Sequence, residues 1–362
     1  MNRLIIIGNG FDLAHGIKTS YKDFITDYLN KVLELFFKED SYSDSLLDIN
    51  HNITKGSFAR TPKKLQKEDV IDYILRLEKN SDFVFKINSL LLKNSLNKIS
   101  EMNWVDLETE YFNVLLATKD GCKGSSQFKE IQKVNDQLDF LKSKLEEYLE
   151  QQQRYFSNIS DKKPLIECFT EAIYPHEIVT VTLDKKQLPE NLYFLNFNYT
   201  NTFENYMIEC KKIIPSDFNY IHGNLFGGHG KPIFGFGDEL DKRYLEFEDE
   251  KNNQLFKHIK SFEYLKTKNY SLLTRFIESE HFQVHIYGHS CGLSDRTMLN
   301  QIFEHENCKS IKIFYHKIDE NHNDYTEKTY EMSRHFKDKG MLRKKVIPFD
   351  RSSEMPQPSN TI

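Results

Sequence analysis

The chain has 362 residues, a formal net charge of −5 and 39 % hydrophobic residues. That length can bury a real core in one large or two smaller domains, and the negative charge argues against general affinity for nucleic acid or anionic membranes. No apolar run is long enough to span a bilayer, and no signal-peptide pattern opens the chain. The five widely spaced cysteines form no C-x-x-C motif. We therefore expect reduced thiols, a cytoplasmic location and no metal site.

The opening residues contain the most informative motif. Leu4–Ile7 predicts a buried strand, and it is followed directly by Gly8-Asn9-Gly10-Phe11-Asp12. Glycines at a strand end allow a sharp turn and close approach of another molecule, and phosphates and nucleotides bind at such junctions. Asn9 and Asp12 are candidates for bonding ribose hydroxyls. The alternative is an ordinary turn in which Asp12 makes only loop or cap bonds.

The chain then divides into zones of different character. Residues 1–30 predict a strand, a loop and a helix capped by Thr19 or Ser20. Residues 31–187 predict an almost wholly helical insertion, in which Val84 to Ile99 gives one apolar face. A second apolar stripe, from Ile131 to Tyr148, has 3-4 spacing and is expected to pack on a helix of this chain or of a second copy.

Residues 188–350 alternate between strand and helix patterns, which predicts a Rossmann-like open parallel sheet that also includes the first strand. The expected strands are Leu192–Phe197, Tyr220–Ile221, Pro232–Phe236, Val284–Tyr287, Ile311–Phe314 and Lys345–Ile347. The expected helices are Asn252–Lys260, Asp295–Phe303 and Asp324–Phe336. Residues 351–362 are expected to be a disordered tail.

Polar residues follow several of these strands, at the edge where open α/β sheets bind ligands. Asn198 and Thr200 come after Leu192–Phe197, and Asn198 can orient a water or a ribose. Alternatively, one of them caps a helix that starts near Thr202. His222, before a glycine-rich segment, is either a general base or a structural histidine.

The stretch from Gly288 to Asp295 follows another expected strand. Ser290 and nearby N–H groups are candidates for phosphate binding. The Gly-His-Ser-Cys-Gly fragment also resembles a nucleophile elbow, but it comes too late in the chain to leave room for an acid and a histidine partner. An acidic stretch around Trp104 offers Asp106, Glu108 and Glu110 either as a metal cluster or as a solvated segment.

Taken together, these motifs resemble the AbiH family of bacterial abortive-infection (anti-phage) proteins. The fragments that match are Ile7 to Gly16 with Thr19-Ser20-Tyr21, Trp104 to Glu108, Asn198-Tyr199-Thr200, Ile221-His222-Gly223, and Gly288-His289-Ser290 with Asp295.

The order of Gly-x-Gly, Asn-Tyr, His-Gly and Gly-x-Ser is also similar to the sirtuin-like NAD-binding fold. That resemblance implies that Asn198 and His222 act in NAD hydrolysis. It places pyrophosphate at the Gly8–Asp12 loop and adenosine at Gly288 and Ser290; Thr200 and Asp295 complete the expected nucleotide-binding set. The chain has Thr200 where sirtuins have Asp, has Asp12 where they have a small hydroxyl residue, and lacks their zinc module.

The two resemblances imply an anti-phage effector that hydrolyses NAD or NADP at the nicotinamide–ribose bond, without a permanently bound cofactor. The partners that we expect are the nucleotide, a phage-derived trigger, and a second copy bound through the helical insertion. One alternative is a nucleotide-binding sensor without hydrolysis, which the departures at Thr200 and Asp12 favour. The other is a metal-dependent nuclease that uses the acidic residues near Trp104.

Overall fold

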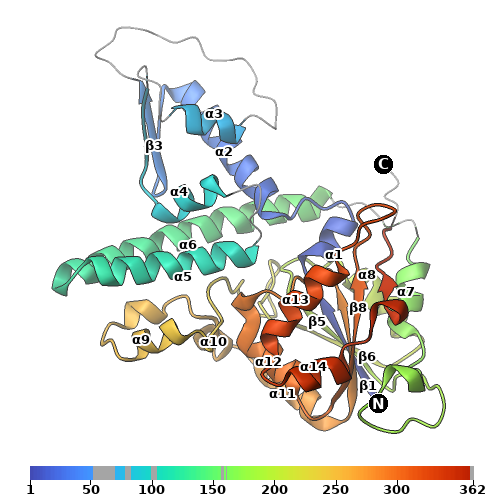
Figure 1. The fold of residues 1–362 in the computed structure, drawn as a ribbon. Coiled ribbons are helices and arrows are strands. Elements are labelled where there is room, and N and C mark those ends of the chain that lie inside the picture. The colour runs from blue at the N-terminus through green and yellow to red at the C-terminus, as the bar shows by residue number, and fades with distance from the viewer. Residues whose placement is uncertain (52–69, 78–82, 99–103, 156–158, 160, 359–362) are drawn as a thin grey trace. The chain divides into compact units, whose positions relative to one another are not determined.

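The chain forms two compact units in a computed structural model that describes residues 1–51, 70–77, 83–98, 104–155, 159 and 161–358 (Figure 1). The first unit comprises Met1–Lys18, Leu149–Lys251 and His258–Ile362, and the second comprises Thr19–Tyr148 and Asn252–Lys257. The sequence places the boundaries of the insertion at residues 31 and 187, whereas the second unit begins at Thr19 and its main segment ends at Tyr148.

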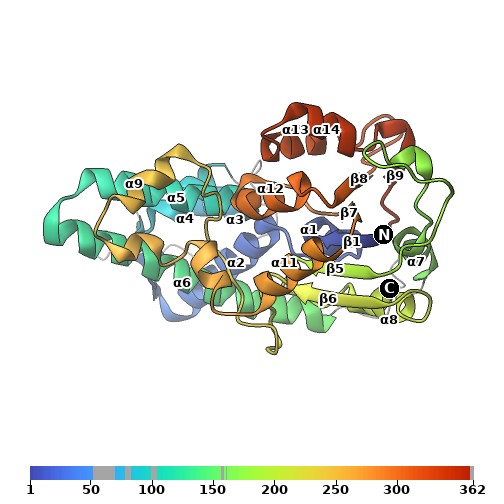
Figure 2. The ribbon, with the colours of Figure 1, turned by 90° about the horizontal axis from the view of Figure 1, so that it is seen from below.

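A six-stranded parallel sheet is the centre of the first unit (Figure 2). Its strands are β1 (Asn2–Ile7), β5 (Leu192–Asn196), β6 (Ser216–Tyr220), β7 (Phe282–Tyr287), β8 (Cys308–Tyr315) and β9 (Ser353–Glu354). They lie in the order β6-β5-β1-β7-β8-β9, and each neighbouring pair is parallel. Counted along the chain, this is the 3-2-1-4-5-6 order of doubly wound sheets. The prediction that the first strand joins the sheet of the C-terminal half is confirmed.

Both faces of this sheet are covered and largely apolar, which explains the hydrophobic run from Leu4 to Ile7 in the first strand. Arg3, Gln283, His285 and Lys312 are buried polar exceptions on its strands. Leu4 and Ile6 belong to a core that includes Leu273 of α11 (Asn269–Ser279) and residues of α12 (Arg296–Glu304) and α13 (Tyr325–His335). Ile5 and Ile7 belong to a core with residues of α1 (Asn9–Ala14), α7 (Lys163–Thr170) and α8 (Glu204–Cys210). Because successive side chains of a strand alternate between faces, β1 contributes to both cores.

The helices of the first unit follow the expected pattern in part. They are α1 (Asn9–Ala14), α7 (Lys163–Thr170), α8 (Glu204–Cys210), α9 (Leu245–Glu248), α10 (Lys260–Tyr264), α11 (Asn269–Ser279), α12 (Arg296–Glu304), α13 (Tyr325–His335) and α14 (Lys339–Lys345). The predicted helices at Asp295–Phe303 and Asp324–Phe336 are confirmed as α12 and α13. The prediction of one helix over Asn252–Lys260 is wrong, because a 3₁₀ turn (Asn253–Phe256) precedes α10 there.

Two predicted strands are wrong, and the tail differs from the expectation of disorder. Pro232–Phe236 and Lys345–Ile347 each contribute only an isolated bridge, through Phe236 and Val346. Short apolar runs can be misread in this way because they do not distinguish a strand from a loop that crosses the core. The tail adds β9 at the sheet edge and buries Met355, whereas residues 359–362 lie outside the described part.

The second unit combines helices with a small antiparallel sheet. Its elements are α2 (Tyr21–Glu39), β2 (Ser41–Ser43), β3 (Leu47–His51), α3 (Val70–Leu77), β4 (Phe83–Ile87), α4 (Leu90–Asn97), α5 (Trp104–Gly121) and most of α6 (Gly124–Tyr155). Helices predominate among the described residues of this zone, as predicted, but the strands β2, β3 and β4 were not predicted. The apolar face assigned to residues 84–99 mixes a strand with a helix, and Ile99 lies outside the described residues.

Two expectations for this unit are confirmed. Ser20 caps α2, and its Oγ accepts a hydrogen bond from the backbone N–H of Asp23 at 3.1 Å. The stripe from Ile131 to Tyr148 is buried on α6, where the Tyr148 ring packs 5.8 Å from that of Phe24. Because residues of this same chain cover the stripe, the stripe supplies no argument for a dimer.

The segments after β1 and β7 approach each other closely at Gly288. Its φ of +65° is rarely adopted by other residues, and a Cβ there would lie 2.0 Å from the backbone nitrogen of Phe11. We expect Gly288→Ala to lower the free energy of unfolding by about 2 to 5 kcal/mol, through strain and overpacking together. The control is Gly228→Ala, since Gly228 has a φ of +84° but open space around it, and about 1 to 2 kcal/mol is expected there. Equal losses in urea unfolding would contradict the close-contact explanation.

Candidate functional site

The segments that follow β1 and β5 are joined by buried polar side chains. Asp12 Oδ2 accepts a hydrogen bond from the Thr200 hydroxyl at 2.5 Å, and Asn198 Nδ2 donates to the carbonyl of Gly8 at 3.0 Å. Burial raises the pKa of Asp12 to about 6, although the bond from Thr200 opposes this. Asp12 can therefore exchange a proton close to neutral pH.

Asn196, the last residue of β5, organises the loop that carries these groups. Its side-chain amide donates to the carbonyls of Asn198 and Thr200, both at 3.0 Å, and its Oδ1 accepts from the N–H of Asn198 at 3.2 Å. The cap interpretation of Asn198 and Thr200 is wrong, because α8 begins at Glu204 without a side-chain cap. Their roles are to hold the loop and to contact the β1 loop.

The glycines of the β1 loop are in contact with a second loop. The N–H of Gly8 donates to the carbonyl of Tyr287 at 3.0 Å, and that of Gly10 donates to Gly288 at 2.8 Å. From the sequence, these two N–H groups are expected to bind pyrophosphate, but in the structure both donate to backbone carbonyls of the protein itself. A Cβ on Gly8 would lie 2.4 Å from the Cα of His289, so the space that the glycine provides is filled by the β7 loop.

The remaining predicted nucleotide-binding residues lie in different surroundings. Phe11 is fully buried, and its ring packs 4.5 Å from His15 and 5.7 Å from Tyr206. Asn9 is half-buried at the start of α1, and Ser290 is exposed after β7. Of these three, Asn9 and Ser290 have side chains that a ligand can reach.

A second polar cluster surrounds His222, which follows β6. Its Nε2 lies 3.2 Å from Asp295 Oδ1 and 3.0 Å from the hydroxyl of Tyr264. Asp295 stands immediately before α12, so the loop after β7 brings its carboxylate to the end of β6. With Nε2 directed at the carboxylate, Nδ1 is left with no hydrogen-bond partner among the described residues. A histidine oriented by a carboxylate in this way can serve as a general base.

Lys260, the first residue of α10, sets the charge of this cluster. Its Nζ lies 2.8 Å from Asp295 Oδ1, and the two side chains are only 1 % and 6 % exposed. Burial would raise the pKa of Asp295, but the ammonium of Lys260 and the ring of His222 hold it below its usual value. Asp295 is thus an anion between two cationic or protonatable groups.

His289 and Phe197 complete the surroundings of His222. Phe197 places its ring 5.1 Å from that of His222 and 4.2 Å from that of His289, both edge to face. His289 Nδ1 accepts from the N–H of Cys291 at 2.9 Å, and burial lowers the pKa of His289 to about 3. Burial therefore favours the neutral ring of His289, whose Nε2 lies 3.9 Å from Asp295 Oδ2.

The structure places the predicted residues in two neighbouring groups at the carboxyl ends of the central strands. Gly8, Asp12, Asn198 and Thr200 form one, and His222 and Asp295 form the other. Phe197 connects them, because it directly precedes Asn198 and packs on His222. No role was predicted from the sequence for Asn196, Lys260, Tyr264 or His289, although His289 belongs to one of the matching motifs. Lys260 and Tyr264 gave no signal, since no spacing relates them to the motifs.

The acidic stretch near Trp104 lies on α5 in the second unit. Trp104 donates through Nε1 to the carbonyl of Thr19 at 2.8 Å, and Glu110 accepts from Asn94 at 2.7 Å and lies 3.4 Å from Lys98 Nζ. Among the described residues, no group of three histidine, cysteine or acidic side chains is placed to hold a metal. The nuclease alternative gains no observation in its favour.

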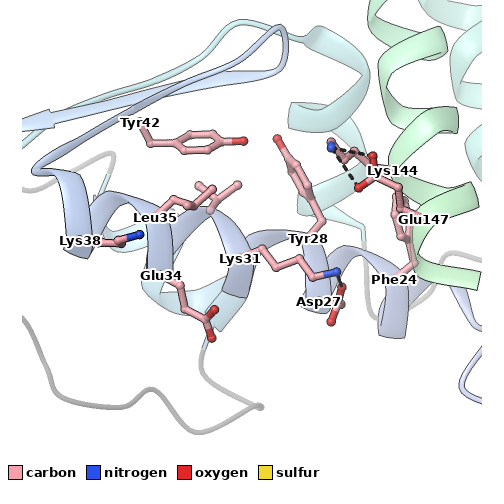
Figure 3. A pocket seen from close by; sticks show the side chains of 11 residues that line it. Phe24, Asp27, Tyr28, Lys31, Glu34, Leu35, Lys38, Tyr42, Lys144 and Glu147 are labelled. Carbon is pink, nitrogen blue, oxygen red and sulfur yellow. Dashed lines mark hydrogen bonds and ion pairs between the residues drawn. The ribbon is translucent and has the colours of Figure 1, made fainter. Parts of the chain in front are cut away.

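A hollow of about 420 Å³ lies in the same unit, between α2, β2 and α6 (Figure 3). Tyr28 and Tyr42 line it, and their hydroxyls both donate to Asp44 Oδ2, at 2.8 and 2.6 Å. Two of its three lysines, Lys31 and Lys144, are paired with acidic neighbours in the hollow, at 2.7 and 2.9 Å, and the third is Lys38. This mixture of paired charges indicates no particular ligand.

The fold and the polar clusters define a doubly wound α/β protein with its candidate site at the carboxyl edge of the parallel sheet. A family model described as bacteriophage abortive infection AbiH matches residues 4–317. The chain belongs to this family, and the match implies a role in anti-phage abortive infection.

Comparison with other proteins adds no further relative. No curated protein and no solved structure matches the chain. Within the described residues, no helix is both long and apolar enough to cross a membrane.

Proposed function

We propose that this AbiH protein is an effector that binds NAD or NADP and hydrolyses the bond between nicotinamide and ribose. The parallel sheet supports a nucleotide ligand, because its strand order is that of doubly wound dinucleotide-binding proteins. The switch in strand order falls between β1 and β7, next to Gly8 and Gly288.

The observation that favours hydrolysis is the pairing of His222 with Asp295. The carboxylate lies 3.2 Å from Nε2, which favours the tautomer with a proton on Nε2 and a lone pair on Nδ1. Lys260 keeps Asp295 ionised, so the orientation of the ring is maintained over a wide pH range. Asn198 stands on the adjacent strand end, one residue beyond the ring that packs on His222.

In the proposed reaction, His222 acts as the general base. His222 removes a proton from water while the water oxygen forms a bond to C1′ of the ribose. The bond between C1′ and the nicotinamide nitrogen breaks, and its electron pair neutralises the positive charge of that ring. Asn198 positions the water or the sugar, and the products are nicotinamide and ADP-ribose or its 2′-phosphate.

A nucleotide sensor without hydrolysis is the second candidate. It is favoured by the bonds between Asp12 and Thr200 and between Asn198 and Gly8. These side chains join two loops, so a bound nucleotide could change the loops without being cleaved.

The two candidates differ in one measurement. Protein purified from infected and uninfected cells is incubated with NAD and with NADP, free nicotinamide is quantified, and binding is measured by calorimetry. We expect nicotinamide release from at least one of the two nucleotides. Binding without release would select the sensor, and neither binding nor release in both preparations would contradict a nucleotide ligand.

A further inference from the structure

A second hollow, in the first unit, is lined by cationic side chains. It has a volume of about 390 Å³ and lies where α12 meets the segment that joins α13 to α14. Its lining residues are Leu240, Leu293, Arg296, Asn300, Arg334, His335, Phe336, Lys337 and Lys339. None of these side chains is acidic, although the whole chain has a net charge of −5.

Carboxylates near the hollow neutralise its cations only in part. Arg296 lies 3.3 Å from Asp238, and Arg334 is paired with Glu331 on the preceding turn of α13. Neither Lys337 nor Lys339 forms an ion pair with a carboxylate within the described residues. Lys339 Nζ donates to backbone carbonyls, one of them that of Phe336 at 2.9 Å.

The segment that supplies these lysines is held in place before any ligand binds. Glu304 of α12 accepts hydrogen bonds from the N–H groups of Lys337 and Asp338, at 2.6 and 3.1 Å. Asn300 donates to the carbonyl of His335 at 2.6 Å. The carboxylate of Glu304 thus bonds to the backbone of the segment and not to its lysine side chains. Because this backbone is already fixed, ordering the lysines around an anion costs less conformational entropy.

We propose that this hollow binds the phosphate groups of a small phosphorylated molecule, at a site separate from His222. Its volume is within the range of small-molecule pockets, about 300 to 1,000 Å³, and arginine and lysine are the side chains that bind phosphate best. Leu240 and Leu293 provide an apolar wall for the rest of the molecule. The proposal is independent of NAD hydrolysis.

The hollow also shares a loop with the site of His222. Leu293 and Arg296, which line it, flank Asp295 in sequence. His335 Nε2 donates to the carbonyl of Cys291 in the same loop at 2.6 Å. A phosphorylated ligand in the hollow would therefore contact the segment that orients His222.

Charge reversal tests the proposal with the full chain and inorganic triphosphate as the probe. Binding is measured by calorimetry at low ionic strength, where phosphate contacts are strongest. We expect Arg334→Glu/Lys337→Glu to weaken triphosphate binding by about tenfold or more, since charged hydrogen bonds to the phosphates are lost. Both residues are exposed, so the variant should keep the wild-type melting temperature.

The matched control is Arg343→Glu/Lys344→Glu. It makes the same change in net charge on exposed residues of the same basic segment, outside the hollow. A loss below about threefold is expected there, because screening weakens distant charges. Equal losses in both variants, or no triphosphate binding by the wild type, would overturn the proposal. Binding of a short DNA duplex but not of triphosphate would also overturn it, in favour of a nucleic-acid surface.

Discussion

His222→Ala is expected to reduce nicotinamide release by about 10² to 10⁴ fold, the usual contribution of a positioned general base. The ring is held by Asp295 at 3.2 Å and Tyr264 at 3.0 Å, so its removal deletes a base that the carboxylate orients. His222→Gln should lose as much activity, because an amide can still bond to Asp295 but cannot accept a proton at neutral pH. The rate of nicotinamide release from NAD and NADP measures both variants.

His229→Ala is the control for this prediction. His229 lies seven residues further along the same glycine-rich region, where its ring packs 5.0 Å from that of Tyr220. We expect its activity to stay near that of the wild type, and all three variants should melt close to the wild-type temperature. Unchanged release by a folded His222→Ala protein would rule out His222 as the base.

The sequence predicts the central part of the sheet well, for a physical reason. A strand that is buried on both faces is expected to be mostly apolar, and β1, β5, β7 and β8 are rich in apolar residues, although Arg3, Gln283, His285 and Lys312 are buried in them. Pro232–Phe236 is also mostly apolar but crosses the core as a loop with an isolated bridge, so its pattern predicts a strand that does not form. In the second unit, the apolar residues of strand β4 and helix α4 together have the spacing of one helical face, so the pattern predicts one helix where there are two elements.

The candidate site was predictable only where its residues follow strands. Asn198 and His222 stand in loops, Asp12 lies on α1 and Asp295 ends a 3₁₀ turn before α12. All four follow strands at the carboxyl edge of the sheet, and one general rule places ligand-binding residues there. Lys260 is on a short helix 35 residues before Asp295, and only the folded chain brings the two together. The hydrogen-bond partners of these side chains also could not be predicted from the sequence. The amide of Asn198, for example, donates to the backbone carbonyl of Gly8.

Lys260→Met is expected to lower the free energy of unfolding by about 3 to 5 kcal/mol, because it leaves Asp295 buried without its principal cation. Methionine keeps most of the volume and removes the charge. The wild-type pair should stabilise the fold at pH values above about 4, the ordinary pKa of an aspartate. That stabilisation is lost as the pH falls through the depressed pKa of Asp295. In the variant, the loss of Lys260 raises the pKa of Asp295, so acid unfolding should depend less steeply on pH.

A second substitution separates the charge from the packing at this position. Lys260→Met/Asp295→Asn removes both charges, and we expect it to recover more than half of the lost stability, since replacing both members of a buried pair is often close to neutral. Nicotinamide release should stay low in the double variant, because His222 then lacks the carboxylate that orients it. Urea unfolding and the activity assay, measured on the same preparations, test both statements. A double variant no more stable than Lys260→Met would show that the lysine stabilises the fold by packing and not by its charge.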